Sequence, residues 1–373
     1  MSHDRPLVVV ADETLFDEIL RLAAAVGCAA QHAPDLVAAR GYWARAPLVL
    51  VDEQAVHDGL PRRPGILLVT KGPPLAETWR RAFEAGVEKV VSLPDGEATL
   101  IGVLADIAEG PGVPGGCVVG VLGGRGGAGA SVLAAASGLV AAEQGEALLI
   151  DCDPLGGGVD LLLGAEAYDG LRWPGVLVGS GRISLPTLTK TLPERRYRGG
   201  RLPFVSCDRM GQGPTAESVA SIVEAGRRAG SVVVCDLPRH LGPQAEAVLR
   251  RADLVVLVVP AEVRACAAAN RVAETIAEVR DHTRLVVRGP ASKGLCPEDV
   301  AKAVGLPLLT FMPPEPQLER SLEAGRFEPR SRGPLVTAAR LMLSEARSGL
   351  CGKASAMNRQ VDPIEHRLAE KDS

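Results

Sequence analysis

The chain has 373 residues, of which 46% are hydrophobic and 23% charged, with a formal net charge of −4. This composition excludes a mostly disordered chain, because enough apolar surface is present to offset the entropy of folding. The acidic balance gives no support to a protein that coats nucleic acid. None of the eight cysteines has a zinc-site spacing, which favours buried thiols in a reducing compartment. The N-terminus has no signal-peptide pattern and no apolar run reaches about 18 residues, so we expect a cytoplasmic protein.

The first hundred residues alternate short aliphatic runs with amphipathic stretches. They predict strands at residues 7–11, 48–51, 66–69 and 87–93, and helices at 14–26 and 75–85. Aliphatic strands separated by helices imply a parallel sheet covered on both faces. The run EGPGVPGG at 109–116 predicts a linker, which leaves residues 1–108 as a first domain.

A second α/β pattern begins at residue 117. Strands are predicted at 118–122, 147–150, 232–235, 254–259 and 285–288, and helices at 131–143, 216–229, 261–278 and 334–347. They predict a larger doubly wound domain over 117–343 with a mostly parallel sheet. The apolar stripe of the last helix (Leu335, Ala338, Leu341, Met342 and Ala346) favours packing on the sheet over binding to lipid. Residues 344–373 are expected to form a frayed helix and a polar tail.

The most informative segment is a glycine-rich turn between the strand at 118–122 and the helix that follows. It places Gly124, Gly126, Gly127 and Gly129 where backbone N–H groups can point into one concavity at the positive end of a helix. The spacing fits the dinucleotide fingerprint, with Asp151 as the ribose-binding acid. It also fits a P-loop from Gly124 to Ser131, except that Ala130 stands at the lysine position.

Acidic residues at later strand ends favour the P-loop. An apolar strand ends at Asp236, and Asp151 and Asp153 follow another. A strand-terminal aspartate together with the hydroxyl of Ser131 is what a phosphate-bound Mg²⁺ requires, and a dehydrogenase needs neither. We therefore predict a nucleotide-binding loop formed by Gly124, Arg125, Gly126, Gly127, Ala128, Gly129, Ala130 and Ser131. The predicted metal ligands are Ser131, Asp236 and Asp151.

Four segments in register carry a family resemblance: the glycine loop, DCDPLGGGVDLLLG, VVVCDLP and ADLVVLVVPAEV. Together they resemble the MinD/ParA group of P-loop ATPases with a deviant Walker A motif. A receiver-like domain in front of such a domain resembles the CpaE branch and the actinobacterial septum site-determining proteins. The resemblance implies ATP and Mg²⁺ as ligands, a nucleotide-dependent homodimer, and partners in cell division or in pilus or secretion machines.

The loop departs from the family pattern at both of its lysines. The lysine that reaches across the dimer is Arg125 here, which keeps the charge, and the lysine that holds the β- and γ-phosphates is Ala130. Losing that cation about 4 Å from a phosphate forfeits about 4 kcal/mol of attraction at an effective dielectric of 20, before desolvation offsets it. We therefore expect weak nucleotide binding, and slow or absent hydrolysis.

The resemblance also assigns two further roles. Asp153 occupies the place of the family aspartate that orients the attacking water, and Arg125 would share the catalytic role. The asparagine that the family often uses near the base is replaced by Arg288, before Gly289 and Pro290.

The first domain resembles a phosphoacceptor receiver of the flavodoxin-like type. Its strand ends carry Asp12 with Glu13, then Asp52, then Thr70, and Leu93 stands where a receiver has its lysine. An acidic site without that cation would hold Mg²⁺ but stabilise an acyl phosphate poorly. We therefore expect a degenerate receiver that docks proteins.

Three functions fit these residues. The first is a MinD/CpaE-like nucleotide-dependent regulator that positions or regulates a septum or a pilus or secretion machine, with peripheral membrane contact only through partners. The second is a pseudo-ATPase scaffold that binds no nucleotide. The third is a DNA-binding partition protein, which the net charge of −4 disfavours.

Overall fold

The computed structural model describes residues 5–57, 59–109, 113, 115–176, 183, 185–209, 211, 213–291 and 295–360. They form two compact units, which divide between residues 112 and 113. Of the segment predicted as a linker, residues 110–112 and 114 lie outside the described residues, as do residues 361–373 of the predicted tail. Each unit is described by itself below.

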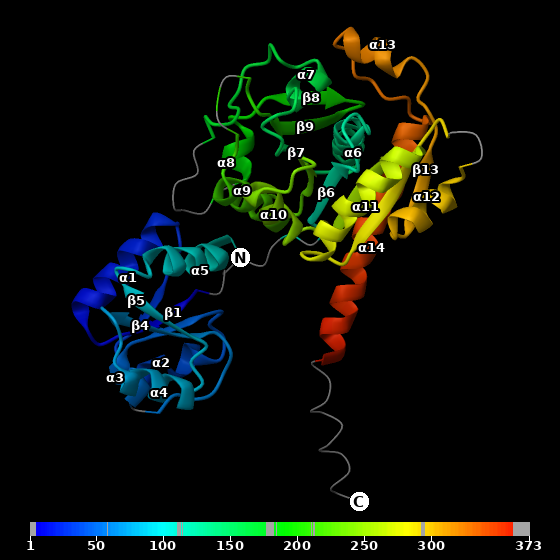
Figure 1. Ribbon diagram of the computed structural model, residues 1–373. Helices are drawn as coiled ribbons and strands as arrows, with labels where there is room; N and C mark the ends of the chain where they lie inside the picture. The colour runs from blue at the N-terminus through cyan, green and yellow to red at the C-terminus, as the bar shows by residue number, and fades with distance from the viewer. Residues whose placement is uncertain are drawn as a thin grey trace, which may run out of the picture. The chain divides into compact units, whose positions relative to one another are not determined.

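The smaller unit is a five-stranded parallel sheet with helices on both faces (Figure 1). Its strands lie in the order β2-β1-β3-β4-β5, the order of flavodoxin-like folds. The strands are β1 (Leu7–Val9), β2 (Gln31–Ala33), β3 (Val49–Val51), β4 (Ile66–Lys71) and β5 (Lys89–Leu93). The helices are α1 (Glu13–Ala25), α2 (Leu36–Trp43), α3 (Glu53–His57), α4 (Ala76–Glu84) and α5 (Glu97–Glu109).

The two faces of this sheet bury separate cores. Val8 of β1 packs in one cluster with Leu15 of α1 and Leu100 of α5, whereas Val9 packs in the other with Ala39 of α2. Successive side chains of a strand point to opposite faces, so continuous aliphatic runs are what a doubly covered sheet requires. The parallel sheet expected from those runs is confirmed.

The larger unit is built on an eight-stranded sheet in the order β13-β12-β11-β6-β10-β7-β9-β8. All neighbours are parallel except β8 and β9, which form an antiparallel hairpin at one edge that the sequence patterns did not predict. The strands are β6 (Cys117–Gly123), β7 (Ala147–Asp151), β8 (Glu194–Tyr197), β9 (Gly200–Val205), β10 (Val232–Asp236), β11 (Leu254–Pro260), β12 (Thr283–Arg288) and β13 (Leu308–Met312).

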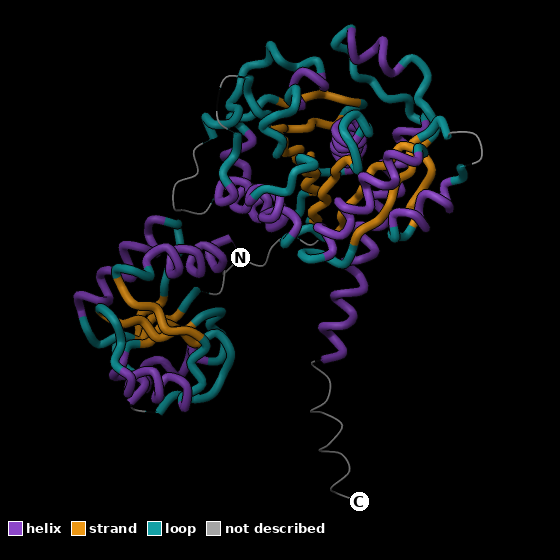
Figure 2. Tube along the Cα trace, viewed as in Figure 1, coloured by secondary structure: helices purple, strands orange, loops and turns teal. Residues whose placement is uncertain are grey.

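Helices cover both faces of this sheet, as Figure 2 shows. They are α6 (Ala130–Gln144), α7 (Val159–Leu163), α8 (Leu185–Thr189), α9 (Ala216–Arg228), α10 (Pro243–Leu249), α11 (Val263–Ala277), α12 (Pro297–Val304), α13 (Leu318–Glu323) and α14 (Pro334–Gln360). The expected doubly wound fold with a mostly parallel sheet is therefore confirmed.

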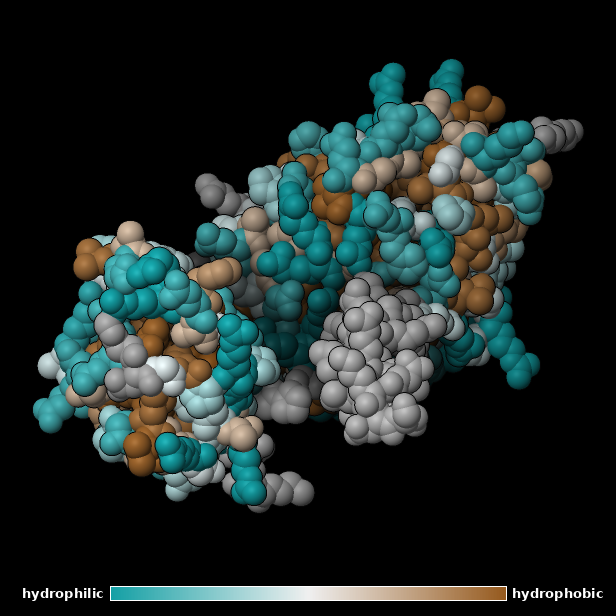
Figure 3. Space-filling view, turned by 90° about the horizontal axis from the view of Figure 1, so that it is seen from below, coloured by the Kyte–Doolittle hydropathy of each residue, from teal (hydrophilic) through white to brown (hydrophobic). Residues whose placement is uncertain are grey.

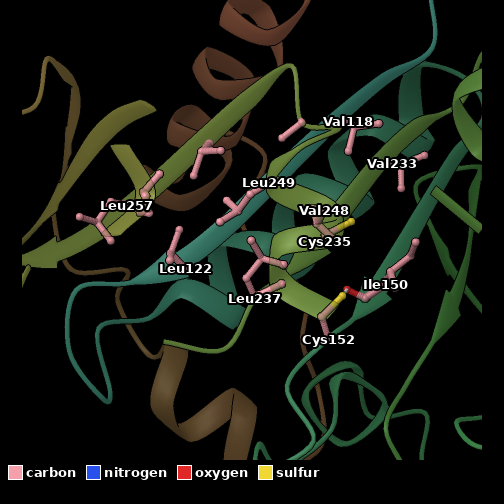
Figure 4. Close-up of a cluster of buried hydrophobic side chains, with 14 of the residues drawn as sticks. Val118, Leu122, Ile150, Cys152, Val233, Cys235, Leu237, Val248, Leu249 and Leu257 are labelled. Atoms are coloured by element: carbon pink, nitrogen blue, oxygen red, sulfur yellow. Dashed lines mark hydrogen bonds between the residues drawn. The ribbon is translucent and has the colours of Figure 1, made fainter. Parts of the chain in front are cut away.

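Alternate residues of the central strand β6 divide between two cores. Val118 and Leu122 join the cluster under α9, α10, α11 and α12, which Figure 4 shows together with Cys152 and Cys235. Val119 and Val121 join the cluster under α6 and α14. Six of the cysteines in the described part of the chain are buried and Cys296 is exposed, so most of these thiols serve as small hydrophobic side chains.

The last helix continues past the predicted end of the second domain. The domain end expected at residue 343 falls inside α14, which continues to Gln360. Its apolar stripe extends past that point, because Ala346 is buried with Met342 in the cluster beside α6. The predicted packing of this helix on the sheet is confirmed, but Leu341 is exposed and does not belong to the stripe.

The surface of both units is largely hydrophilic on the face that Figure 3 shows, with hydrophobic side chains scattered among the polar ones. Within the described ranges, no helix combines the length and the apolar character that a membrane crossing needs.

Candidate functional site

The carboxyl ends of the central strands of the larger unit meet at one edge of its sheet. In the register of β10, Asp236 lies opposite Asp151 of β7 and Val121 of β6. In the register of β11, Pro260 lies opposite Arg288 of β12. Parallel strands place their carboxyl ends together, and ligands of open α/β sheets bind at that edge. The glycine-rich loop leaves β6 at the same edge.

Three of the four glycines in the loop are required by its shape. A Cβ at Gly124 would lie 2.6 Å from the Cβ of Ala269, so the strand end packs directly on α11. Gly127 and Gly129 have φ angles of +71° and +94°, in the left-handed region that glycine tolerates best. Gly126 has no such constraint. The glycines are therefore used to turn the chain sharply from β6 into α6.

The turn leaves backbone donors free at the start of α6. Gly129 is the N-cap, and no side chain caps the helix. In the part of the chain that the structure describes, no backbone acceptor is recorded for the N–H groups of Gly126, Gly127 and Gly129. A Cβ at Gly126 or Gly127 would meet no heavy atom within 4 Å, so the space beside them is open. Free N–H groups at a positive helix end suit an anion.

Ser131 and Asp236 are brought together next to this loop. Ser131 lies beside Asp236, where its hydroxyl favours the ionised form of the Asp236 carboxyl and so acts to lower its pKa. Asp236 is only 4% exposed, and no ion pair to it is recorded among the described residues. Burial, and then the charge of Asp151, raise the pKa of Asp236 well above its usual range. Among the described residues, this buried acid therefore has no recorded cationic partner.

Asp151 lies opposite Asp236 in the register but is engaged in a different way. Its Oδ1 accepts the N–H of Asp153 at 3.1 Å, and its Oδ2 accepts those of Val159 at 3.2 Å and Cys207 at 3.0 Å. Burial raises its pKa in spite of these hydrogen bonds. The carboxylate thus fixes the loop after β7 to the end of β9. Its predicted role as a metal ligand stays a prediction.

Asp153 stands on the same loop and is partly exposed. Its Oδ1 accepts the N–H of Leu155 at 3.0 Å, which leaves the second oxygen without a recorded partner among the described residues. Its predicted role with water stays a prediction.

Two neighbouring pockets flank the N-terminus of α6. One, of about 370 Å³, is lined by Ser131, Asp151, Asp153 and Asp236, and by residues of the loop after β7. The other, of about 530 Å³, is lined by Gly129 and Arg288, by the segment that follows β13, and by α13. Leu322 of α13 lines both, so the two pockets share a wall. Together they offer an acidic compartment and a larger, mixed one beside the N-terminus of α6.

The donor set of the smaller pocket fits Mg²⁺ only together with a ligand. Within the described ranges, no group of three or more His, Cys, Asp or Glu residues is placed to hold a metal ion alone. Mg²⁺ is commonly held by one or two carboxylates plus phosphate oxygens and water. The hydroxyl of Ser131 and the buried carboxylate of Asp236 are oxygen ligands of that kind.

Arg125, at the tip of the loop, is held by its own chain. Its Nη2 lies 2.8 Å from Glu262 Oε1, just before α11, and its Nη1 donates to the carbonyl of Gly126 at 3.1 Å. The side chain is about one third exposed. The role expected from the resemblance, reaching a partner's nucleotide, would require this ion pair to open.

A buried ion cluster next to the site was missed from the sequence. Asp160, at the start of α7, is 0% exposed. Its Oδ2 lies 2.8 Å from Nε of Arg172, and its Oδ1 lies 2.8 Å from Nη2 of Arg209. Burial opposes its charge, but the hydrogen bond from Arg172 and the charge of Arg209 outweigh burial and lower its pKa. Asp160 was visible in the sequence, but its two partners lie 12 and 49 residues away and belong to no recognisable motif.

The receiver-like site of the smaller unit corrects one expectation. The acidic site was expected to lack a cation, because Leu93 stands at the usual lysine position. Instead, Lys71 at the end of β4 places its Nζ 2.6 and 2.8 Å from the two oxygens of Asp12, and it also contacts Thr14. The hydrogen bond from Lys71 holds the pKa of Asp12 well below its usual range.

Asp52, the expected phosphoacceptor position, is buried and used by the fold. Its Oδ2 accepts the N–H of Ala11 at 2.7 Å, and its Oδ1 accepts the N–H of Ala55 at 2.9 Å. The hydroxyl of Thr70 donates to the carbonyl of Gly72. Both oxygens of Asp52 thus accept backbone N–H groups of the unit. The prediction of a degenerate receiver that docks proteins stays a prediction.

Replacing Lys71 with Met is expected to make Asp12 titrate at a higher pH than in the wild-type chain. The ammonium group stabilises the ionised carboxylate, so its removal returns the pKa toward the usual value. Carboxyl NMR signals followed through a pH titration would measure the shift, with Lys89→Met as a control at another exposed lysine. An unchanged Asp12 titration curve would contradict the contact.

Comparison with known proteins places both units. Residues 9–115 match the family described as Rv3660c-like, CheY-like N-terminal domain. The uncharacterized protein Rv3660c of Mycobacterium tuberculosis (strain ATCC 25618 / H37Rv) is 41% identical over 357 residues, which cover 93% of this chain and 100% of that protein. The match to a CheY-like domain confirms the receiver-like fold expected for the first domain.

The larger unit is similar to solved ATPase structures. A ParA family ATPase from Chlorobium tepidum TLS superposes with a TM-score of 0.51 at 16% identity, covering 62% of this chain and 98% of that chain. The MinD cell division protein of Aquifex aeolicus gives a TM-score of 0.47 at 21% identity, covering 63% of this chain and 96% of that one. The likeness to the ParA family ATPase confirms the P-loop fold expected from the sequence resemblance.

Proposed function

The chain belongs to the family of Rv3660c-like proteins and joins a CheY-like domain to a P-loop domain of the MinD/ParA fold, and from this premise we propose that it is a nucleotide-binding regulatory protein. Its ligand would be an adenine nucleotide with Mg²⁺, bound at the glycine-rich loop. The observation that carries the proposal is the contact between Ser131 and Asp236 at the start of α6.

The arrangement around that contact supports a bound phosphate chain. Free N–H groups of the loop and the N-terminus of α6 would hold phosphate oxygens, and the open space beside Gly126 and Gly127 would admit them. The pocket of about 530 Å³ beyond Gly129 has room for a nucleoside. Two adjacent compartments that share Leu322 as a wall suit a ligand with one charged and one mixed end.

Ser131 and Asp236 would hold Mg²⁺, with Asp151 as a further proposed ligand. Bound Mg²⁺ would neutralise charge on the phosphates. Asp153 lines the same pocket, and its second carboxylate oxygen could orient a water molecule. Ala130 provides no charge, and Arg125 is paired with Glu262, so we propose that hydrolysis is slow or absent.

The cellular role is proposed from the resemblance to MinD/ParA and CpaE proteins. In this proposal, nucleotide binding switches a homodimer that recruits cell-division, pilus or secretion proteins. The smaller unit would contribute a docking surface, because both oxygens of Asp52 are committed to its backbone.

Titration of the full chain with ATP, with and without Mg²⁺, tests the proposed binding. We expect Mg²⁺-dependent binding in the wild-type chain that is weakened at least about tenfold by Ser131→Ala, the loss expected when a ligand hydroxyl is removed from a charged site. Ser137→Ala is the matched control, because the Ser137 hydroxyl is buried on the same helix and donates to the carbonyl of Leu133.

Two outcomes would overturn the proposal. Absence of binding to the wild-type chain at millimolar ATP would favour the scaffold that binds no nucleotide. Equal weakening by Ser131→Ala and Ser137→Ala would place the effect in the helix and not in the site.

A further inference from the structure

The phosphate loop lacks a free cation of its own. The position that usually carries the phosphate-binding lysine is Ala130. Arg125, the remaining basic residue of the loop, has its guanidinium paired with Glu262 at 2.8 Å. A triphosphate bound here would therefore depend on backbone dipoles and Mg²⁺ alone, unless a cation comes from another part of the chain.

Arg288 brings a guanidinium to this loop from a distant strand. It is the last residue of β12, which is separated from β6 by β11 in the sheet. Its backbone is fixed on one side by the N–H of Ala261, which donates to its carbonyl at 2.9 Å. Its side chain reaches the N-cap of α6, because a Cβ at Gly129 would lie 3.1 Å from Nη1 and 3.4 Å from Cδ of Arg288.

Among the residues that the structure describes, this guanidinium has no recorded partner. Nε of Arg288 is buried without a hydrogen-bond acceptor, and no ion pair to this residue is recorded among the described parts of the chain. Three other charged residues line the same pocket, namely Glu315, Glu319 and Arg320. Oε2 of Glu315 accepts the N–H of Leu335 at 3.2 Å, and its Oε1 is buried without a hydrogen-bond partner among the described residues. A partly buried cation without a partner is costly, so an anion is expected beside it.

We propose that Arg288 binds the phosphate chain of the nucleotide and takes the place of the lysine that is missing at position 130. The inference rests on the proposed function and adds the residue that supplies the cation. Gly129 directly precedes α6, and a helix N-terminus is where phosphates bind. The planar fork of an arginine matches phosphate oxygens with two hydrogen bonds. The lack of a side chain at Gly129 is what lets the guanidinium approach so closely.

The test separates phosphate binding from binding of the base. Inorganic tripolyphosphate with Mg²⁺, adenosine and ATP are each titrated into the full chain by calorimetry. Arg288→Ala is expected to weaken the binding of tripolyphosphate and of ATP by about tenfold or more, as for the loss of a charge-assisted hydrogen bond. The binding of adenosine is expected to stay unchanged. Arg284→Ala is the matched control, since Arg284 lies on the same strand β12 but outside the pocket, where its Nε donates to Glu345 Oε1 at 2.8 Å.

Rescue of phosphate binding by a second substitution provides another measurement. It would not succeed if Arg288 had only a structural role. Ala130→Lys in the Arg288→Ala background is expected to restore tripolyphosphate binding, because the two side chains would supply the same charge by different routes. Thermal unfolding of each variant shows whether the fold is intact.

The possible failures are distinguishable. If the wild-type chain binds none of the three probes, the proposed function and this inference both fail. If it binds ATP and Arg288→Ala binds tripolyphosphate equally well, the inference fails and the proposed function stands. If Arg288→Ala weakens the binding of adenosine and of ATP alike but leaves the binding of tripolyphosphate unchanged, Arg288 binds the base and the inference is overturned.

Discussion

An Asp236→Asn variant without nucleotide is expected to unfold at a higher temperature than the wild-type chain, and at the same time to lose Mg²⁺-dependent nucleotide binding. The carboxyl is buried, has no recorded cationic partner in the described chain, and lies opposite a second buried acid in the register of β10 and β7. Removing an uncompensated buried charge is stabilising. We expect a gain of about 1 kcal/mol, or roughly 2–4 °C for a unit of this size.

The neighbouring Asp151 provides a matched substitution with the opposite expected sign. Its two oxygens accept three backbone N–H groups, and an asparagine has only one acceptor oxygen for them. Asp151→Asn should therefore lower the free energy of unfolding by about 1–3 kcal/mol, the usual cost of leaving a buried donor without its acceptor. If both variants moved stability in the same direction, the roles assigned to the two acids would be wrong.

The binding part of this prediction is measured on the same protein. Asp236→Asn is expected to weaken the binding of ATP at least about tenfold in the presence of Mg²⁺, because an amide is a poorer ligand than a carboxylate for a hard cation. Binding without Mg²⁺ should change little. A variant that is more stable and binds Mg²⁺-ATP as well as the wild-type chain would remove Asp236 from the metal site.

Replacement of Asp160 by Ala is expected to be the most destabilising single change in the cluster beside the site, at about 3–5 kcal/mol. Asp160 is 0% exposed and pairs with Arg172 and Arg209 at 2.8 Å each. Its loss leaves the mostly buried guanidinium of Arg172 without a counter-charge. Arg172 also donates to carbonyls of the loop after α7, so the loop would lose its anchor.

Tryptophan fluorescence can report this effect selectively. Of the three tryptophans, only Trp173 belongs to the larger unit, where it is buried and donates to the carbonyl of Asp151 at 2.9 Å. A background with Trp43→Phe and Trp79→Phe would leave it as the single probe during denaturation by guanidinium chloride. Glu166 is an exposed acid on the same loop, so Glu166→Ala is the control. It should change the free energy of unfolding little.

The effect of Asp160 should also depend on pH in a defined direction. Its pKa is lower in the folded chain than in the unfolded one, so its contribution is fully present above the unfolded value of about 4. The contribution is lost as the pH falls through the folded value. The difference in stability between the wild-type chain and Asp160→Ala should therefore shrink in acid, and a constant difference down to low pH would contradict the ion pairs.

Much of this fold could be predicted from the sequence, because its strands are buried on both faces and appear as continuous aliphatic runs. The strands β6, β7, β10 and β11 were predicted to within one residue at each end. The β8–β9 hairpin was not predicted, because the β8 sequence ERRY is polar. This strand forms the edge of the sheet, where few side chains are buried and the sequence shows no apolar run. The short β2 was missed for a similar reason, as only Ala33 of its three residues is buried.

The candidate site could also be predicted from the sequence only in part. The glycine loop, Ser131 and Asp236 were found because a motif of fixed spacing and a strand end carry them. Lys71, Arg288 and Glu262 acquire their roles from partners far away in sequence, so only the folded chain shows them. Arg288 was noticed as a departure near the expected base site, but its approach to Gly129 depends on the order of strands in the sheet.

The two amide hydrogen bonds that hold Asp52 have a consequence for how this protein could receive information. A receiver changes shape when a kinase modifies its acceptor, whereas here the same oxygens already maintain the resting conformation. In the proposed docking role, the smaller unit would present its surface without any modification of Asp52. Under the proposed function, a change of state would then come from the nucleotide held by the other unit.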